Sequence, residues 1–133
     1  MDFSHIGENG SFWDPSICQG GRYAYWYIQN DITSVTISKG IEIIGQNAFF
    51  ASQALNKIIM PSSVRTIEYG VFFYCTALTE ITIPNSVKEI QKVFSSNQSI
   101  TVHVPWKEGE KPEGWADNWA ANDSGTVTID YAK

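Results

Sequence analysis

A repeat of 23 residues constrains this sequence more than any other feature. The segment "SKGIEIIGQNAFFASQALNKIIMP" is followed by "SSVRTIEYGVFFYCTALTEITIP", and Phe49 and Phe72 stand 23 positions apart. A third copy, which ends at Pro105, is two residues shorter than the copy that ends at Pro84. A fixed period of about 20–50 residues is the signature of a solenoid, in which each unit buries its apolar face only against its neighbours.

Within one copy the apolar pattern changes period, which indicates several short elements around a single coil. Ile81 and Ile83 alternate with polar residues, as in a short strand whose apolar side chains face inward. Val87 and Ile90 turn a second apolar pair inward, and Phe72 suits a helical or 3₁₀ turn that places an aromatic ring in the centre. Each coil should therefore supply one strand, one further inward pair and one aromatic turn.

Equivalent strands of successive coils stack about 4.7–4.9 Å apart, so we expect one small parallel sheet along the solenoid. Its inward pairs are predicted to be Val35/Ile37, Ile58/Met60, Ile81/Ile83 and Val102/Val104.

The combined pattern L-x-x-I-x-I-P-x-S-V-x-x-I-x-x-x-A-F-x-x-C-x-x-L resembles the BspA-like class of leucine-rich repeats, found mostly in bacterial surface proteins and some protists. The resemblance covers about Ile32 to Pro105, and Cys75 falls where that class usually places cysteine. The tail "KPEGWADNWAANDSGTVTIDY" is similar to the Gly-Trp…Trp segment that often closes such arrays. The resemblance implies an α/β repeat, a leucine-rich-repeat solenoid of about three coils of 21–23 residues with short parallel strands, mostly β structure and turns, capped at both ends.

The chain of 133 residues is long enough for one domain with its own core. We expect residues 1–31 to form an N-terminal cap, residues 32–105 the repeats and residues 106–133 a C-terminal cap. Caps are expected because the end of a solenoid exposes an unpaired strand edge and an open core, which invite aggregation.

Aromatic residues gather at both ends of the chain. "RYAYWYIQN", in which Tyr23 and Tyr25 alternate with other residues as in a strand, precedes the first coil, and Trp106, Trp115 and Trp119 follow the last. Caps are one interpretation of these aromatic residues, and a carbohydrate-binding platform of exposed rings is the other.

Composition narrows the class of protein. The net charge of −5 and a sequence pI near 4.9 argue against nucleic acid or an anionic membrane surface as partner. No apolar run is long enough to span a bilayer, and no signal peptide is visible in the chain, so a cytoplasmic location stays open beside a surface one. Of the two cysteines, Cys75 is predicted to be a buried structural thiol, while Cys18 lies in a Gly-rich turn.

The common catalytic and metal-binding motifs are missing from the sequence. His5 and His103 are the only histidines, and neither lies in a metal-ligand spacing. There is no G-x-S-x-G motif and no phosphate-binding Gly loop. We therefore expect no enzyme activity, no cofactor and no metal.

The outward face of the sheet is the candidate binding surface, because residues between inward pairs point the other way. Solenoids commonly bind partners along such a face, because the stacking of coils makes it extended and continuous. Outward threonines are also good strand formers with no ligand implied. The candidate binding residues are Thr36, Ile59, Thr82 and His103, flanked by Ser34, Lys57, Glu80 and Thr101.

The sequence thus favours a non-catalytic protein-interaction module, and the resemblance implies a segment of a bacterial surface or secreted protein with adhesive or host-contact roles. A small acidic inhibitor or immunity-type protein that blocks an enzyme inside the cell is the alternative. Glycan binding through the terminal aromatics is a third interpretation. The partner and the oligomeric state stay open.

Overall fold

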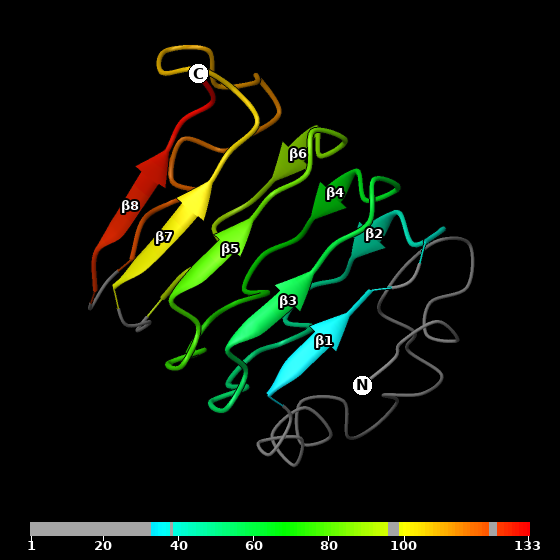
Figure 1. Ribbon diagram of the computed structural model, residues 1–133, viewed down its shortest axis with the longest axis vertical. Helices are drawn as coiled ribbons and strands as arrows, with labels where there is room; N and C mark the ends of the chain where they lie inside the picture. Colours follow the sequence, from blue (N-terminus) through cyan, green and yellow to red (C-terminus); the bar gives the residue numbers. More distant parts are fainter. Residues whose placement is uncertain (1–32, 38, 96–98, 123–124) are drawn as a thin grey trace.

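The computed structural model describes residues 33–37, 39–95, 99–122 and 125–133, which form a parallel-strand solenoid. Its strands lie in two rows, one on each wall of the coil (Figure 1). The first row contains β1 (Ser34–Thr36), β3 (Lys57–Ile59), β5 (Glu80–Thr82), β7 (Ile100–His103) and β8 (Val127–Asp130). The second row contains β2 (Ile43–Ile44), β4 (Thr66–Ile67) and β6 (Glu89–Ile90). The expected leucine-rich-repeat solenoid is confirmed.

The strands of the first row occur where the repeat predicts them, but they do not form one continuous sheet. β1 pairs with β3 and β5 pairs with β7, in both cases in parallel, while no pairing joins β3 to β5. Met60 stands at this step, whereas β-branched Ile37, Ile83 and Val104 occupy the equivalent positions. Met60 is half-buried and lacks the branched shape that packs well on a pleated surface. The expectation of an unbroken sheet was therefore wrong at one step.

The second row is a regular ladder of three parallel strands, in the order β2, β4, β6. The tail of the chain extends both walls. Trp115 forms a parallel bridge with Ile90 at the end of the second row, and β8 adds a fifth strand beside β7 in the first. The last coil is thus completed by residues that do not carry the repeat pattern.

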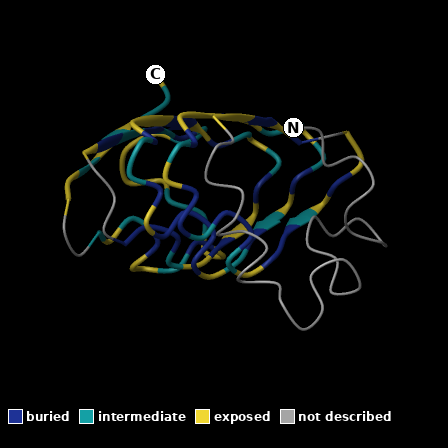
Figure 2. Ribbon diagram, turned by 90° about the horizontal axis from the view of Figure 1, so that it is seen from below, coloured by how far each residue is buried: buried dark blue, intermediate teal, exposed yellow. Residues whose placement is uncertain are grey.

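The buried residues follow the inside of the coil, between the two walls (Figure 2). Equivalent side chains of successive coils fill the core. Phe49, Phe72 and Phe94 are fully buried and stack along the solenoid, with ring centroids 6.2 Å and 5.9 Å apart. Phe49 and Phe72 lie in hydrogen-bonded turns, and no helix occurs in the described residues, although a helical or 3₁₀ turn was expected here. Ala51 and Tyr74 have φ of 59° and 60°, and this left-handed conformation ends each turn before a helix can continue.

Candidate functional site

The structure brings the predicted candidate residues onto one exposed face. Backbone register places Thr36 beside Ile59 and Thr82 beside His103. The first three side chains are exposed and His103 is half-buried. Ile59, at 47% exposure, is one of the few large apolar side chains on the surface of the described residues. We call Thr36, Ile59, Thr82 and His103 the outward row.

A flanking row runs parallel to the outward row at the amino ends of the strands. It contains Ser34, Lys57, Glu80 and Thr101. Lys57 and Glu80 are exposed and carry the opposite charges of this row.

β8 extends the outward face by residues that were not among the predicted candidates. Thr128 lies beside Thr101, and Asp130 lies beside His103, in parallel register. The segment "TVTID" has the same alternation as "ITVHV" in β7, and this alternation was the available signal. It was missed because the tail was interpreted as a cap rather than as a further strand.

His103 lies between two carboxylates that come from the strands on either side. Its Nδ1 is 2.6 Å from Oδ2 of Asp130, and its Nε2 is 2.5 Å from Oε1 of Glu80. An ionised carboxylate only accepts hydrogen bonds, and a neutral imidazole carries only one N–H, so the geometry fits the protonated ring. The hydrogen bond to Asp130, followed by the one to Glu80, raises the pKa of His103 above its ordinary value. The protonated side chain thereby connects β5, β7 and β8 across the outward face.

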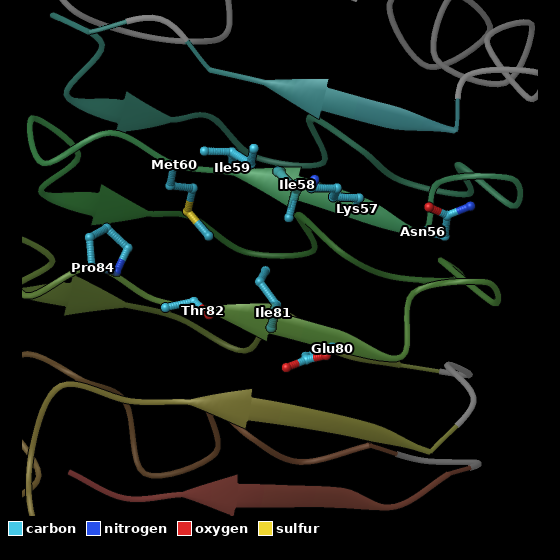
Figure 3. A pocket seen from close by; sticks show the side chains of 9 residues that line it. All are labelled: Asn56, Lys57, Ile58, Ile59, Met60, Glu80, Ile81, Thr82 and Pro84. Atoms are coloured by element: carbon cyan, nitrogen blue, oxygen red, sulfur yellow. The ribbon is translucent and has the colours of Figure 1, made fainter.

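A hollow of about 560 Å³ opens on the outward face at the step between β3 and β5 (Figure 3). One end of it is polar, with Asn56, Lys57 and Glu80. The other end is mostly apolar, with Ile59, Met60, Thr82 and Pro84. Ile58 and Ile81 complete the lining.

Cys75 is confirmed as a buried structural thiol. It has no exposed surface, and its Sγ donates a hydrogen bond to the carbonyl oxygen of Phe49 at 3.1 Å. Burial raises the pKa of the thiol to about 12, so it is protonated at neutral pH and is not a nucleophile. Cys18 lies outside the described residues.

The tryptophans of the tail are part of the core. Trp115 is 1% exposed and Trp119 is 3% exposed, and Trp106 packs edge-on against both rings. Buried rings cannot stack on a sugar, so these two tryptophans do not form a glycan platform. The aromatic residues Tyr23 to Tyr27 at the other end lie outside the described residues.

The two carboxylates beside His103 form neither a shared acid pair nor a metal centre among the described residues of the outward face. Glu80 and Asp130 contact opposite nitrogens of His103 and therefore do not converge on one point. In the part of the chain that the structure describes, no group of His, Cys, Asp and Glu side chains could hold a metal ion. His5 lies outside this part. No helix among the described residues is long and apolar enough to cross a membrane.

Comparison with known families agrees with this architecture. The family described as "BspA type Leucine rich repeat region (6 copies)" matches residues 21–108. The chain belongs to this family. Searches of curated proteins and of solved structures gave no match. A leucine-rich-repeat solenoid is typically a non-catalytic scaffold for protein interactions, which fits the exposed strand face and the buried thiol.

Proposed function

We propose that this leucine-rich-repeat domain binds a protein partner through the outward row and the flanking row, as part of a bacterial surface or secreted protein that contacts host material. The observation that carries the proposal is the register of the strands. Equivalent side chains stand side by side on β1 and β3 and again on β5, β7 and β8, and the two stretches lie on the same exposed face.

The centre of this strip has the features of an interaction site. Ile59 is an exposed apolar side chain, and exposed threonines and the charges of Lys57 and Glu80 surround it. A small apolar contact enclosed by polar groups is the usual arrangement of a non-obligate interface. Since a few central residues dominate most interfaces, Ile59 is the residue whose change should matter most.

The test compares the chain with an Ile59→Glu, His103→Ala double variant for binding to immobilised extracellular-matrix proteins and to immobilised bacterial cytosolic proteins. We expect saturable binding to the extracellular material and at least a tenfold loss in the variant. Ile59→Glu alone should keep a melting temperature close to that of the parent chain, because exposed substitutions usually change stability by only about 0.5 kcal/mol, whereas His103→Ala also removes the contacts with Glu80 and Asp130 and should lower it. Lys88→Glu, which changes an exposed residue next to β6 on the other wall, is the control and should keep full affinity.

Two results would contradict the proposal. Full affinity in the double variant would remove the outward face as the binding surface. Binding to a basic cytosolic enzyme with inhibition of its activity, and none to extracellular material, would favour the intracellular inhibitor instead.

A further inference from the structure

The first row of strands ends at β8, whose outer edge has no partner among the described residues. β8 pairs only with β7, and no described strand lies on its other side (Figure 1). The N–H of Ile100 donates to the carbonyl of Thr126 at 2.9 Å, and the N–H of Val104 donates to the carbonyl of Asp130 at 3.0 Å. Alternate residues of the tail strand therefore direct their backbone groups toward β7.

The intervening residues are Val127, Ile129 and Tyr131, and their backbone groups point toward the free edge. No backbone hydrogen bond reaches these groups from the part of the chain that the structure describes. The side chains of the same residues pack against the core but are only half-buried, whereas Val35 and Ile37 at the other end of the row are buried. The end of the solenoid at β8 thus offers unpaired backbone groups and incompletely covered apolar side chains together.

The side chains of β8 do not block this edge. Its four residues include no lysine and no proline, which natural proteins often place on an edge strand to prevent pairing with another chain. Its one charged residue, Asp130, has a carboxylate oxygen 2.6 Å from Nδ1 of His103, on the side of β7. An unpaired edge without such a block is a template for a further strand.

The β8 strand of a second copy matches this edge in one antiparallel register. When Ile129 stands opposite Ile129 of the second copy, the residues that direct their backbone groups outward pair with each other. Val127 then stands opposite Tyr131, which is a favourable pair of a β-branched and an aromatic side chain. On the other face, the Thr128 hydroxyl stands opposite Asp130 and can donate a hydrogen bond to its carboxylate.

The two neighbouring registers are poorer. A shift by two residues in one direction places Asp130 opposite Asp130 of the second copy, and like charges directly opposite each other are destabilising. A shift in the other direction places Tyr131 opposite Gly125, which has no side chain to cover the ring. The edge is therefore self-complementary in the register centred on Ile129.

We propose that β8 is the contact surface of a homodimer, in which the β8 strands of two copies pair in antiparallel around a two-fold axis at Ile129. Such a contact uses the same residues on both copies and closes on itself. It covers the half-buried end of each core with that of the other copy. This inference is independent of the proposed function, because it depends only on the strand edge.

The dimer would also change how the outward face meets a partner. The two-fold axis is perpendicular to the sheet, so the outward rows of both copies lie on the same side. A partner that carries two copies of its recognised surface could then engage both rows, which raises the overall affinity without any new contact.

The first arm of the test measures the mass of the chain by sedimentation equilibrium at concentrations up to about 1 mM, where weak interfaces form. The mass should rise from 14.9 kDa toward twice that value. Thr128→Asp places a like charge opposite Asp130 and should weaken the dimer at least fivefold, whereas Thr128→Lys should strengthen it at least twofold. Thr36→Asp, an equally exposed outward change on β1, is the matched control and should change the dissociation constant less than twofold.

The second arm tests the register by disulfide cross-linking in a Cys18→Ser background. A mixture of Thr128→Cys chains and Asp130→Cys chains should cross-link readily, because directly opposite residues of this kind have Cα atoms about 4.5 Å apart. Thr128→Cys alone should not cross-link, since its two copies would be offset along the strands by more than about 7 Å. Thr101→Cys mixed with Asp130→Cys is the control, because Thr101 lies on β7, one strand farther from the edge.

Hydrogen exchange followed by NMR examines the main chain. In dilute solution the amide of Ile129 should exchange quickly and that of Thr128, which faces β7, should exchange slowly. At high concentration the amide of Ile129 should become protected as well.

Several results would overturn the inference. A mass that stays at 14.9 kDa over the whole concentration range would do so. Dimerisation that Thr128→Asp and Thr128→Lys leave unchanged would assign the contact to another surface. Cross-linking of Thr128→Cys with itself as fast as with Asp130→Cys would contradict the register and with it the pairing around Ile129.

Discussion

Replacement of Trp115 by alanine should destabilise the entire domain, although Trp115 lies outside the repeats. The side chain is 1% exposed and packs edge-on against Trp119 and Trp106, with centroids 4.8 Å and 5.4 Å away. Its Nε1 donates a hydrogen bond to the carbonyl oxygen of Val87 at 3.2 Å. The ring thus connects the tail to the backbone of the preceding coil.

The magnitude follows from these contacts. Truncation of a buried Trp typically costs about 3–5 kcal/mol. An acceptor left unsatisfied in the core costs about 1–3 kcal/mol more. The total of about 4–8 kcal/mol is comparable with the stability of a whole domain, about 5–15 kcal/mol. For a domain of this size, each 1 kcal/mol lowers the melting temperature by about 3–5 °C, so we expect a fall of at least about 12 °C.

Thermal and urea unfolding, followed by circular dichroism, measure this effect. Trp115→Phe removes the donor to Val87 together with part of the indole but keeps a buried aromatic ring, so its cost should lie below that of Trp115→Ala. Tyr69→Ala removes an aromatic side chain that is 44% exposed and should shift the midpoint by only a few degrees. A midpoint for Trp115→Ala within about 3 °C of the parent chain would show that the tail does not close the solenoid.

Three further outcomes test the core, the outward face and the tail. At neutral pH a maleimide dye should label Cys75 only after unfolding, as located by mass spectrometry, and rapid labelling of the native chain would contradict its buried position. Folding raises the pKa of His103 above its ordinary 6.5, so the stabilisation is fully present below pH 6.5 and is lost as pH rises through the folded value. The advantage in melting temperature of the parent chain over His103→Gln should therefore shrink from pH 6 to pH 8, and a pH-independent difference would refute the paired-carboxylate geometry. Gly114→Ala should lower the melting temperature strongly, since an added Cβ would overlap the backbone carbonyl oxygen of Lys88, whereas the exposed neighbour Glu113→Ala should leave it unchanged.

The positions of the strands and of the core residues follow directly from the repeat. Inward pairs such as Val35/Ile37 and Ile81/Ile83, and the stacked rings of Phe49 and Phe72, recur at a fixed spacing and can be predicted from one coil. The outward row follows from the same alternation, because residues between inward pairs have only the other face available.

A helical or 3₁₀ turn was expected around Phe49 and Phe72, and the structure has isolated i to i+3 turns without a helix. The difference depends on backbone geometry that an apolar pattern does not express. Ala51 and Tyr74 adopt left-handed φ values, although neither residue type prefers them. Each donates its backbone N–H to a carbonyl of the next coil, Phe73 and Ser95 respectively, at 2.8 Å. Stacking between coils, rather than local propensity, selects the conformation.

The repeat period therefore fixes what every coil has in common, and the tertiary structure decides where the coils differ. Asp130 lies beside His103 only because β8 pairs with β7. The two residues are 27 positions apart, which is not the spacing of the 23-residue repeat. The opening between β3 and β5 likewise depends on how two particular coils pack around Met60. The repeat pattern predicts the environment that equivalent positions share in every coil. A contact such as that of His103 with Asp130 depends on which residues surround one particular position in the folded chain.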